Sequence, residues 1–92
     1  MALNSGGLPG HYSKIFSQLA VKKYSGKYED GALESLIKEA IEHMKIWKPE
    51  PYEQILADFK AQLKMYGNVK DAAYESRQQL YNEAIPIIAM CE

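Results

Sequence analysis

Apolar residues recur with helical spacing in four segments of the chain. The clearest segment lies between Asp30 and Trp47, where an unbroken apolar stripe occupies one side and polar residues fill the other. Asp30 is a suitable N-cap for this helix. Pro49 disfavours helical geometry at the residue before it, so we expect the helix to end near Trp47. The stripe consists of Leu33, Leu36, Ile37, Ala40, Ile41 and Met44.

The segments before and after this helix show the same periodicity. The first predicted helix runs from about residue 12 to residue 24 and stops near Gly26, a natural helix breaker. The third begins at residues 49–51, because proline is tolerated in the first turn of a helix. Gly67 is expected to close it as a left-handed cap. The stripes of these two helices consist of Tyr12, Ile15, Phe16, Leu19, Tyr52, Ile55, Leu56, Phe59, Leu63 and Tyr66.

The fourth predicted helix starts directly after Gly67. Asn68 is a good N-cap, and Asp71 falls in the first turn, where an acidic side chain is favourable. Pro86 would remove a helical hydrogen bond and clash with the preceding turn, so we expect a kink or an early end there. The stripe of this helix is thinner than the others and consists of Val69, Ala73, Leu80, Ala84, Ile87 and Ile88.

Short connections determine how these helices are arranged. Links of roughly two to four residues force consecutive helices to be antiparallel neighbours. The sequence therefore predicts an all-α fold, a small antiparallel up-and-down four-helix bundle formed by residues 11–92 as one domain. Residues 1–10, rich in glycine, are predicted to form a flexible leader. A helical-hairpin repeat is the structural alternative, although the chain holds barely two such units and a stable stack needs about three.

Charge is balanced over the whole chain but not along it. Eleven Lys plus Arg stand against twelve Asp plus Glu, which argues against a general nucleic-acid binder because phosphate neutralisation needs an excess of basic groups. Residues 1–28 nevertheless carry four lysines and no acid. These lysines form a candidate basic face for an acidic partner or an anionic membrane surface, and a chance distribution is the alternative. They are Lys14, Lys22, Lys23 and Lys27.

Candidate catalytic and metal-binding groups are sparse. Glu39 and His43 lie one helical turn apart, but a zinc site needs three or four ligands and no second half is visible. Cys91 lies one residue from the end of the sequence, where no rigid surroundings would orient a nucleophile. We therefore expect a protein that is not an enzyme, with no catalytic residue, metal or cofactor. The single cysteine and the lack of a long apolar run favour a cytoplasmic location.

Aromatic residues are more informative than the polar ones. Tyr and Trp are common in protein interfaces because they bury a large area at low entropic cost. The candidate partner-binding residues lie at helix ends, at stripe edges and in the apolar C-terminal stretch: Trp47, Tyr74, Tyr81, Ile85 and Ile88. The alternative is that the aromatic residues seal the ends of the bundle. We expect a protein partner, while a homodimer through the fourth helix and a peripheral membrane contact remain alternatives.

Helix lengths and apolar spacing over residues 12–88 resemble those of a known family. The residues that carry the resemblance are Lys27-Tyr28-Glu29-Asp30, Leu33 with Leu36-Ile37, the break from Pro49 to Tyr52, Ile55-Leu56 and Leu80-Tyr81-Asn82-Glu83. The pattern is similar to that of bacteriocin immunity proteins of the pediocin and enterocin type. This resemblance implies a cytoplasmic bundle that protects a producer cell by binding a complex of bacteriocin and membrane receptor, with specificity in the last two helices. A phage- or plasmid-encoded inhibitor or adaptor and a helical-repeat interaction fragment are the alternative functions. A nucleic-acid or membrane-surface accessory that acts through the basic first helix is a more distant alternative.

Overall fold

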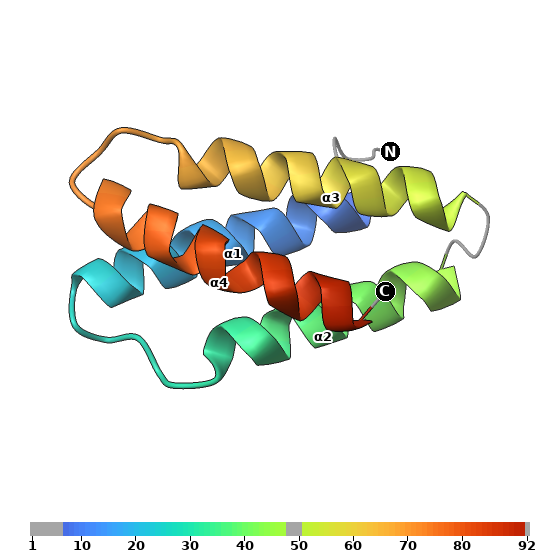
Figure 1. Ribbon diagram of the computed structural model, residues 1–92, viewed down its shortest axis with the longest axis horizontal. Helices are drawn as coiled ribbons and strands as arrows, with labels where there is room; N and C mark the ends of the chain where they lie inside the picture. The colour runs from blue at the N-terminus through green and yellow to red at the C-terminus, as the bar shows by residue number, and fades with distance from the viewer. Residues whose placement is uncertain (1–6, 48–50, 92) are drawn as a thin grey trace.

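The computed structural model describes residues 7–47 and 51–91, and this part of the chain forms four α-helices (Figure 1). The helices are α1 (Gly7–Tyr24), α2 (Ala32–Trp47), α3 (Tyr52–Gly67) and α4 (Tyr74–Cys91). Successive helices run in opposite directions, so the predicted all-α up-and-down bundle is confirmed. Both α1 and α4 pack against α2 and α3, whereas α2 and α3 contact each other least although they are consecutive in sequence.

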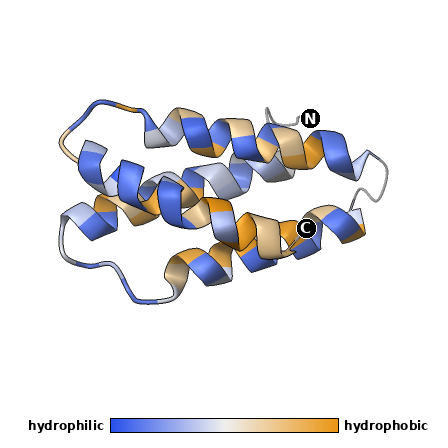
Figure 2. Cartoon of the chain, in the orientation of Figure 1, coloured by the Kyte–Doolittle hydropathy of each residue, from blue (hydrophilic) through white to orange (hydrophobic). Residues whose placement is uncertain are grey.

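The hydrophobic core lies between the four helices and consists mainly of side chains that periodicity assigned to it, whereas Ile15, Tyr52, Ile55, Tyr66 and Ile87 are only partly buried. All six residues of the α2 stripe are buried, and Phe16 of α1 and Phe59 of α3 are fully enclosed. Each fully buried side chain of this size contributes about 1.5–3 kcal/mol relative to an exposed one. The apolar residues of α4 gather in its C-terminal half (Figure 2).

The first helix begins earlier than predicted. It starts at Gly7, so residues 7–10 of the predicted leader are helical, and Pro9 is buried. A proline in the first turn costs no hydrogen bond, because the first four amide groups of a helix have no partner within it. The helix stops before Gly26, whose φ of +79° confirms the predicted breaker. The leader prediction for residues 1–6 lies outside the described residues.

The predicted cap of the second helix is wrong, although its predicted end at Trp47 is confirmed. The helix begins at Ala32, directly after Gly31, whose φ of +86° places it in the left-handed region. The first-turn amide of Leu33 donates a hydrogen bond to the hydroxyl of Tyr28, 3.2 Å away. The tyrosine hydroxyl therefore fills the role predicted for Asp30, because the turn at Gly31 moves the helix start beyond that residue.

Two predictions about the end of α3 are also wrong. Gly67 is the last helical residue and does not have a positive φ. It is buried against α4, and a Cβ atom placed on it would lie 3.0 Å from the Cβ of Tyr81. Asn68 terminates α3 instead of starting the next helix, since its side-chain amide donates to the carbonyl of Lys64 at 2.9 Å. Glycine is required here for close approach of two helices rather than for a left-handed turn.

The fourth helix starts later and ends later than predicted. Residues 68–73 form the connection, and α4 begins at Tyr74, so Val69 lies outside the helix and is exposed. Asp71 lies in this connection, where its carboxylate accepts a hydrogen bond from the amide of Ala73 at 2.9 Å. The predicted early end at Pro86 is wrong, because α4 continues to Cys91. Ile88 follows Pro86 in the helix and is buried in the core, and this packing offsets the missing hydrogen bond. The third helix was predicted to begin at residues 49–51; Pro51 is the residue before α3, which begins at Tyr52, and residues 49 and 50 lie outside the described residues.

Candidate functional site

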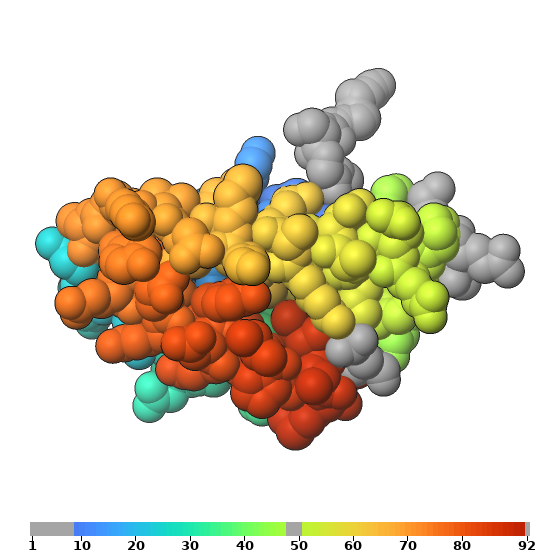
Figure 3. Space-filling model, turned by 45° about the horizontal axis from the view of Figure 1, so that its top comes forward, coloured from blue at the N-terminus to red at the C-terminus, as the bar shows by residue number. Residues whose placement is uncertain are grey.

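A groove of about 260 Å³ lies between α3 and α4. Figure 3 shows these two helices side by side along this face of the molecule. Ile88 is only 4% exposed and forms part of the groove floor, whereas Ile85 is 51% exposed at its edge. We call the groove lined by five of the described residues the α3–α4 groove: Lys60, Tyr81, Ile85, Ile88 and Ala89. The described lining is therefore mainly apolar and includes the ammonium group of Lys60. Ile88 belongs to the core, whereas Ile85 is exposed.

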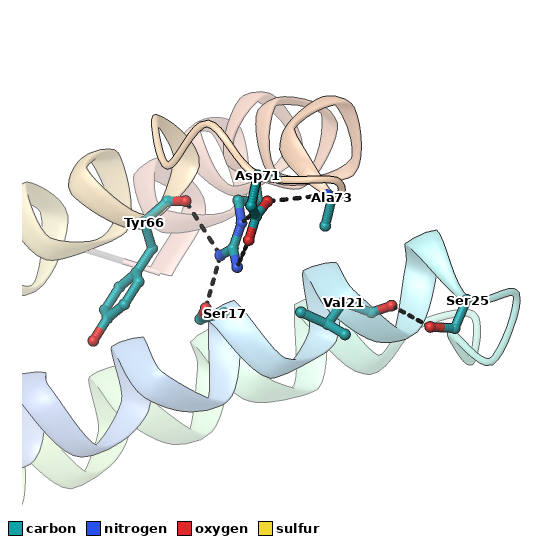
Figure 4. A network of polar contacts seen from close by, with 7 residues as sticks. Ser17, Val21, Ser25, Tyr66, Asp71 and Ala73 are labelled. Atoms are coloured by element: carbon teal, nitrogen blue, oxygen red, sulfur yellow. Dashed lines mark hydrogen bonds and ion pairs between the residues drawn. The ribbon is translucent and has the colours of Figure 1, made fainter.

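The start of α4 is held in place by a buried arginine one turn before Tyr81. Arg77 is 5% exposed, and its guanidinium binds both carboxylate oxygens of Asp71 at 3.1 and 2.9 Å. The same guanidinium donates to the hydroxyl of Ser17 on α1 at 2.7 Å and to the carbonyl of Tyr66 on α3 at 3.4 Å (Figure 4). One side chain thus joins α4 to α1, to α3 and to the connection before it.

Charge pairing keeps Asp71 ionised. The hydrogen bond from Arg77 holds the pKa of Asp71 below its ordinary value of 3.8, and the amide of Ala73 lowers it further, while partial burial opposes the shift. A carboxylate beside the buried guanidinium compensates the charge that Arg77 carries into the bundle.

The sequence contained a signal for this network that periodicity alone does not show. Arg77 lies four residues after Ala73 and three before Leu80, which places it within the apolar stripe of the fourth helix. The stripe is thin because an arginine occupies one of its core positions. A charged residue in a core position predicts an acidic partner nearby, and Asp71 lies six residues earlier in the sequence.

The groove wall is fixed by close contact between α3 and α4. Because Gly67 has no side chain, Tyr81 packs directly against the backbone at the end of α3. The amide of Gln78 donates to the carbonyl of Gly67 and to the side-chain oxygen of Asn68, the latter at 3.0 Å. The position of Tyr81 is therefore set by its contact with the α3 backbone at Gly67 rather than by contacts with flexible side chains.

The structure brings together three of the five predicted partner-binding residues. Tyr81, Ile85 and Ile88 line the groove. Tyr74 is half-buried at the start of the same helix, and Trp47, 54% exposed, ends α2. Neither of these two is among the lining residues. Sequence reasoning did not identify Lys60, because it lies outside the apolar stripes that directed the search. Ala89 lies within the apolar C-terminal stretch but was not among the named candidates.

The four lysines of the predicted basic face are distributed over different surroundings. Lys14 and Lys22 are exposed on α1 and lie eight residues apart, about 12 Å along the helix axis. Lys23 places its ammonium 5.2 Å from the centre of the Tyr28 ring, a cation–π contact. Lys27 lies in the connection between α1 and α2. Three of these lysines therefore lie on α1 and one lies in the connection that follows it, and the basic face stays a prediction.

Glu39 and His43 of α2, the candidate metal-binding pair, both form hydrogen bonds with Tyr12 of α1. The Tyr12 hydroxyl donates to the Glu39 carboxylate at 3.1 Å and also forms a hydrogen bond with Nδ1 of His43. Burial, and then the hydrogen bond and charge of Glu39, raise the pKa of Tyr12 to about 12. This arrangement joins two helices, and the described residues contain no group of three or more His, Cys, Asp or Glu that could hold a metal ion.

A second hollow, of about 270 Å³, lies between α2 and α4 and has a more charged lining. Its described lining consists of Lys38, Ile41, Glu42, Lys45 and Cys91. The ammonium of Lys45 donates to the carbonyl of Cys91 at 3.1 Å, so this contact fastens the last turn of α4 to α2. We assign this hollow a structural role.

Known proteins give no further guide to the site. The chain matches no known protein-family model, no curated protein and no solved structure. No helix in the part of the chain that the structure describes is long and apolar enough to cross a membrane. The function is therefore inferred from the geometry of the chain itself.

Proposed function

We propose that this protein acts by binding a helical segment of a partner protein in the α3–α4 groove. The observation that carries the proposal is the groove itself, in which exposed Ile85 stands beside half-buried Tyr81 and the buried floor at Ile88. In one common mode of recognition, an amphipathic helix lays its apolar face into a hydrophobic groove of this kind.

Preorganisation supports this proposal. The contact with Gly67 and the anchoring of α4 by Arg77 fix Tyr81 before any partner arrives. Binding then requires little ordering of the protein, which leaves more of the contact energy available for affinity. A tyrosine held rigidly in the wall of a groove has properties of an interface hot spot.

The most specific role consistent with the sequence resemblance is immunity-type protection of a producer cell. In that role the protein binds a complex of bacteriocin and membrane receptor. The resemblance implies that specificity lies in the last two helices, and α3 and α4 form the groove. An inhibitor or adaptor would use the same surface, so the identity of the bound protein distinguishes these roles. The proposal contains no catalytic step.

Affinity capture from cells that make the protein tests the proposal. The tagged wild type, Ile85→Asp and the control Ile46→Asp are compared in low and high salt, with bound proteins quantified by mass spectrometry. Ile46 is 80% exposed on α2, so its substitution introduces the same charge away from the groove. We expect one protein to remain in high salt with the wild type and the control, and to fall more than about tenfold with Ile85→Asp.

Two outcomes would contradict the proposal. One is equal capture by wild type and Ile85→Asp when circular dichroism shows that both are folded. The other is recovery of only nucleic acid or lipid, lost in high salt, because screening by salt weakens charge contacts and not apolar ones.

A further inference from the structure

Exposed large hydrophobic side chains gather at the end of the bundle where α1 and α3 both finish (Figure 1). Val21 and Tyr24 lie in the last turn of α1, and Met65 lies in the last turn of α3. Val69 follows α3 in the connection to α4. We call these four residues the α1–α3 apolar cluster. Apolar groups that are exposed together indicate an interaction surface.

Hydrogen bonds fix the register between α1 and α3. The hydroxyl of Ser13 on α1 donates to the side-chain oxygen of Gln62 on α3 at 2.6 Å. Arg77 donates both to the hydroxyl of Ser17 and to the carbonyl of Tyr66. Residues 17 and 66 each follow the first pair by one helical turn, so the two helices run parallel and stay side by side to their ends.

This register brings the members of the cluster to one seam. Val21 lies one turn beyond Ser17, on the side of α1 that faces α3 (Figure 4). Met65 lies three residues after Gln62, on the side of α3 that faces α1. Val21 and Met65 therefore border the seam between the two helices, and Val69 lies at the end of that seam.

Lysines surround the cluster. Residues 11–28 and 61–70 together carry six lysines and no Asp or Glu. One exposed lysine lies seven residues before Val21 on the same side of α1, and three others are direct neighbours in sequence of a cluster residue. These exposed lysines are Lys14, Lys22, Lys64 and Lys70.

Acidic residues at this end of the bundle lie on other elements. Asp71 follows Lys70, but its carboxylate is paired with the guanidinium of Arg77 at 2.9 Å. The other acidic residues belong to α4, to α2 and to the connection between α1 and α2: Glu75, Glu34, Glu29 and Asp30. The seam between α1 and α3 is therefore a surface that is both apolar and basic.

We propose that the α1–α3 apolar cluster and its lysines bind an anionic membrane surface. Acidic lipid headgroups attract lysines, and the boundary between headgroups and acyl chains accepts apolar side chains such as Val21 and Met65. Nucleic acid supplies phosphates but no apolar phase for these side chains, so the combination favours a bilayer. The surface uses α1 and the α1 side of α3, so it is separate from the α3–α4 groove and does not depend on the proposed function.

Co-sedimentation of the full-length protein with vesicles tests this proposal. The vesicles consist of phosphatidylcholine alone or of phosphatidylcholine with about 40% phosphatidylglycerol, in low and high salt. The wild type is compared with Lys22→Gln, Lys70→Gln and Met65→Asp. The controls are Lys38→Gln and Ile46→Asp, which make matching changes at exposed positions of α2, away from the cluster.

We expect the wild type to bind the anionic vesicles, to ignore phosphatidylcholine alone and to be released in high salt. Each of Lys22→Gln and Lys70→Gln should weaken binding about threefold to fivefold. Met65→Asp should weaken it more than about tenfold, because it removes an apolar group and adds a charge that acidic lipids repel. The two α2 controls and Ile85→Asp in the α3–α4 groove should bind as the wild type does.

A second measurement reports which part of the protein enters the bilayer. An environment-sensitive fluorophore is attached to Met65→Cys, or to Ile46→Cys as the control, in a Cys91→Ser background. Fluorescence at position 65 should shift to shorter wavelength with the anionic vesicles, and fluorescence at position 46 should not. A shift at position 46 with none at position 65 would overturn the proposal.

Other results would also overturn it. One is a folded wild type that does not bind the anionic vesicles in low salt, and another is binding that the control Lys38→Gln weakens as much as Lys22→Gln does. A third comes from titration with duplex DNA. If the lysine variants weaken DNA binding and no vesicle binding is seen, the basic surface serves nucleic acid and the membrane assignment is wrong.

Discussion

Arg77 acts at the scale of a single residue to define where α4 begins. Its guanidinium makes hydrogen bonds to three separate parts of the chain, the connection at Asp71, α1 at Ser17 and α3 at Tyr66. A buried arginine is costly unless its charge is paired and its donors are satisfied. Here both conditions are met, so the residue that interrupts the apolar stripe also fixes the helix that bears the groove.

Replacing Arg77 with methionine is expected to lower the free energy of unfolding by about 2–3 kcal/mol. Methionine fills a similar volume but leaves Ser17 and the Tyr66 carbonyl without this donor. Urea denaturation measures the effect, and the exposed Lys14→Met serves as control with a change within about 0.5 kcal/mol. A loss as small as that of the control would show that the network contributes nothing to stability.

Tyr12 provides a residue-scale prediction at alkaline pH. Its pKa rises from 10 in the unfolded chain to about 12 in the fold. The protonated phenol is thus favoured by folding, so its contribution to stability is complete below pH 10 and is lost as the pH rises through 12. We expect Tyr12→Phe to lose about 1 kcal/mol at neutral pH and to show a weaker decline of stability above pH 10.

Chemical denaturation from neutral pH upward measures this difference. Tyr24→Phe is the matched control, because Tyr24 is 59% exposed at the end of α1. Identical alkaline profiles for the wild type and Tyr12→Phe would contradict the assigned role of Tyr12.

At the scale of elements, the close contact between α3 and α4 depends on the absence of a side chain at Gly67. Gly67→Ala would improve intrinsic helix propensity by about 1 kcal/mol, but its Cβ would lie 3.0 Å from the Cβ of Tyr81. Forced overpacking costs about 1–3 kcal/mol, so we expect a net loss of about 1 kcal/mol. Thermal unfolding measures the change in stability, and the Tyr81 ring resonances in NMR report its displacement.

A control on the same helix separates packing from propensity. Ala57 is exposed on α3, and Ala57→Gly should lose about 1 kcal/mol through propensity alone. Adding a methyl group at position 67 and removing one at position 57 should therefore both destabilise the protein. A gain in stability for Gly67→Ala would show that the helices have room to separate at this point.

Periodicity predicted some elements well because their stripes are purely apolar. The six stripe residues of α2 left one choice of buried face, and all six are buried. The predicted start of α4 is wrong because asparagine suits either end of a helix. Asn68 caps the end of α3, and the contact of Arg77 with the Tyr66 carbonyl accompanies a later start of α4. Tyr28 could not be recognised as a cap, because its hydroxyl reaches Leu33 through a turn at Gly31.

The candidate site was only partly accessible from sequence for a related reason. Tyr81, Ile85 and Ile88 share one helix, so their spacing placed them together. Lys60 comes from α3, and its position beside them depends on how two helices pack. The predicted basic face of Lys14, Lys22, Lys23 and Lys27 stays a prediction, with three of the lysines on α1 and Lys27 in the connection after it.

At the scale of the whole molecule, the interior of the bundle provides its stability, and the proposed recognition of a partner uses its exterior. A chain of 92 residues has one small core, and the helices enclose it with Phe16 and Phe59 at full burial. The α3–α4 groove is a place where that core comes to the surface, through Ile88 and its exposed neighbour Ile85. Binding at this groove would extend the core with apolar groups from the partner.

Site-specific photo-crosslinking in cells that make the protein tests this binding most directly. A photoreactive phenylalanine derivative replaces Tyr81 in the groove, and in separate samples it replaces Lys14 on α1 or Trp47 at the end of α2. We predict that position 81 yields a covalent adduct with one protein and that positions 14 and 47 do not. An adduct from position 14 or 47, with none from position 81, would contradict recognition through the α3–α4 groove.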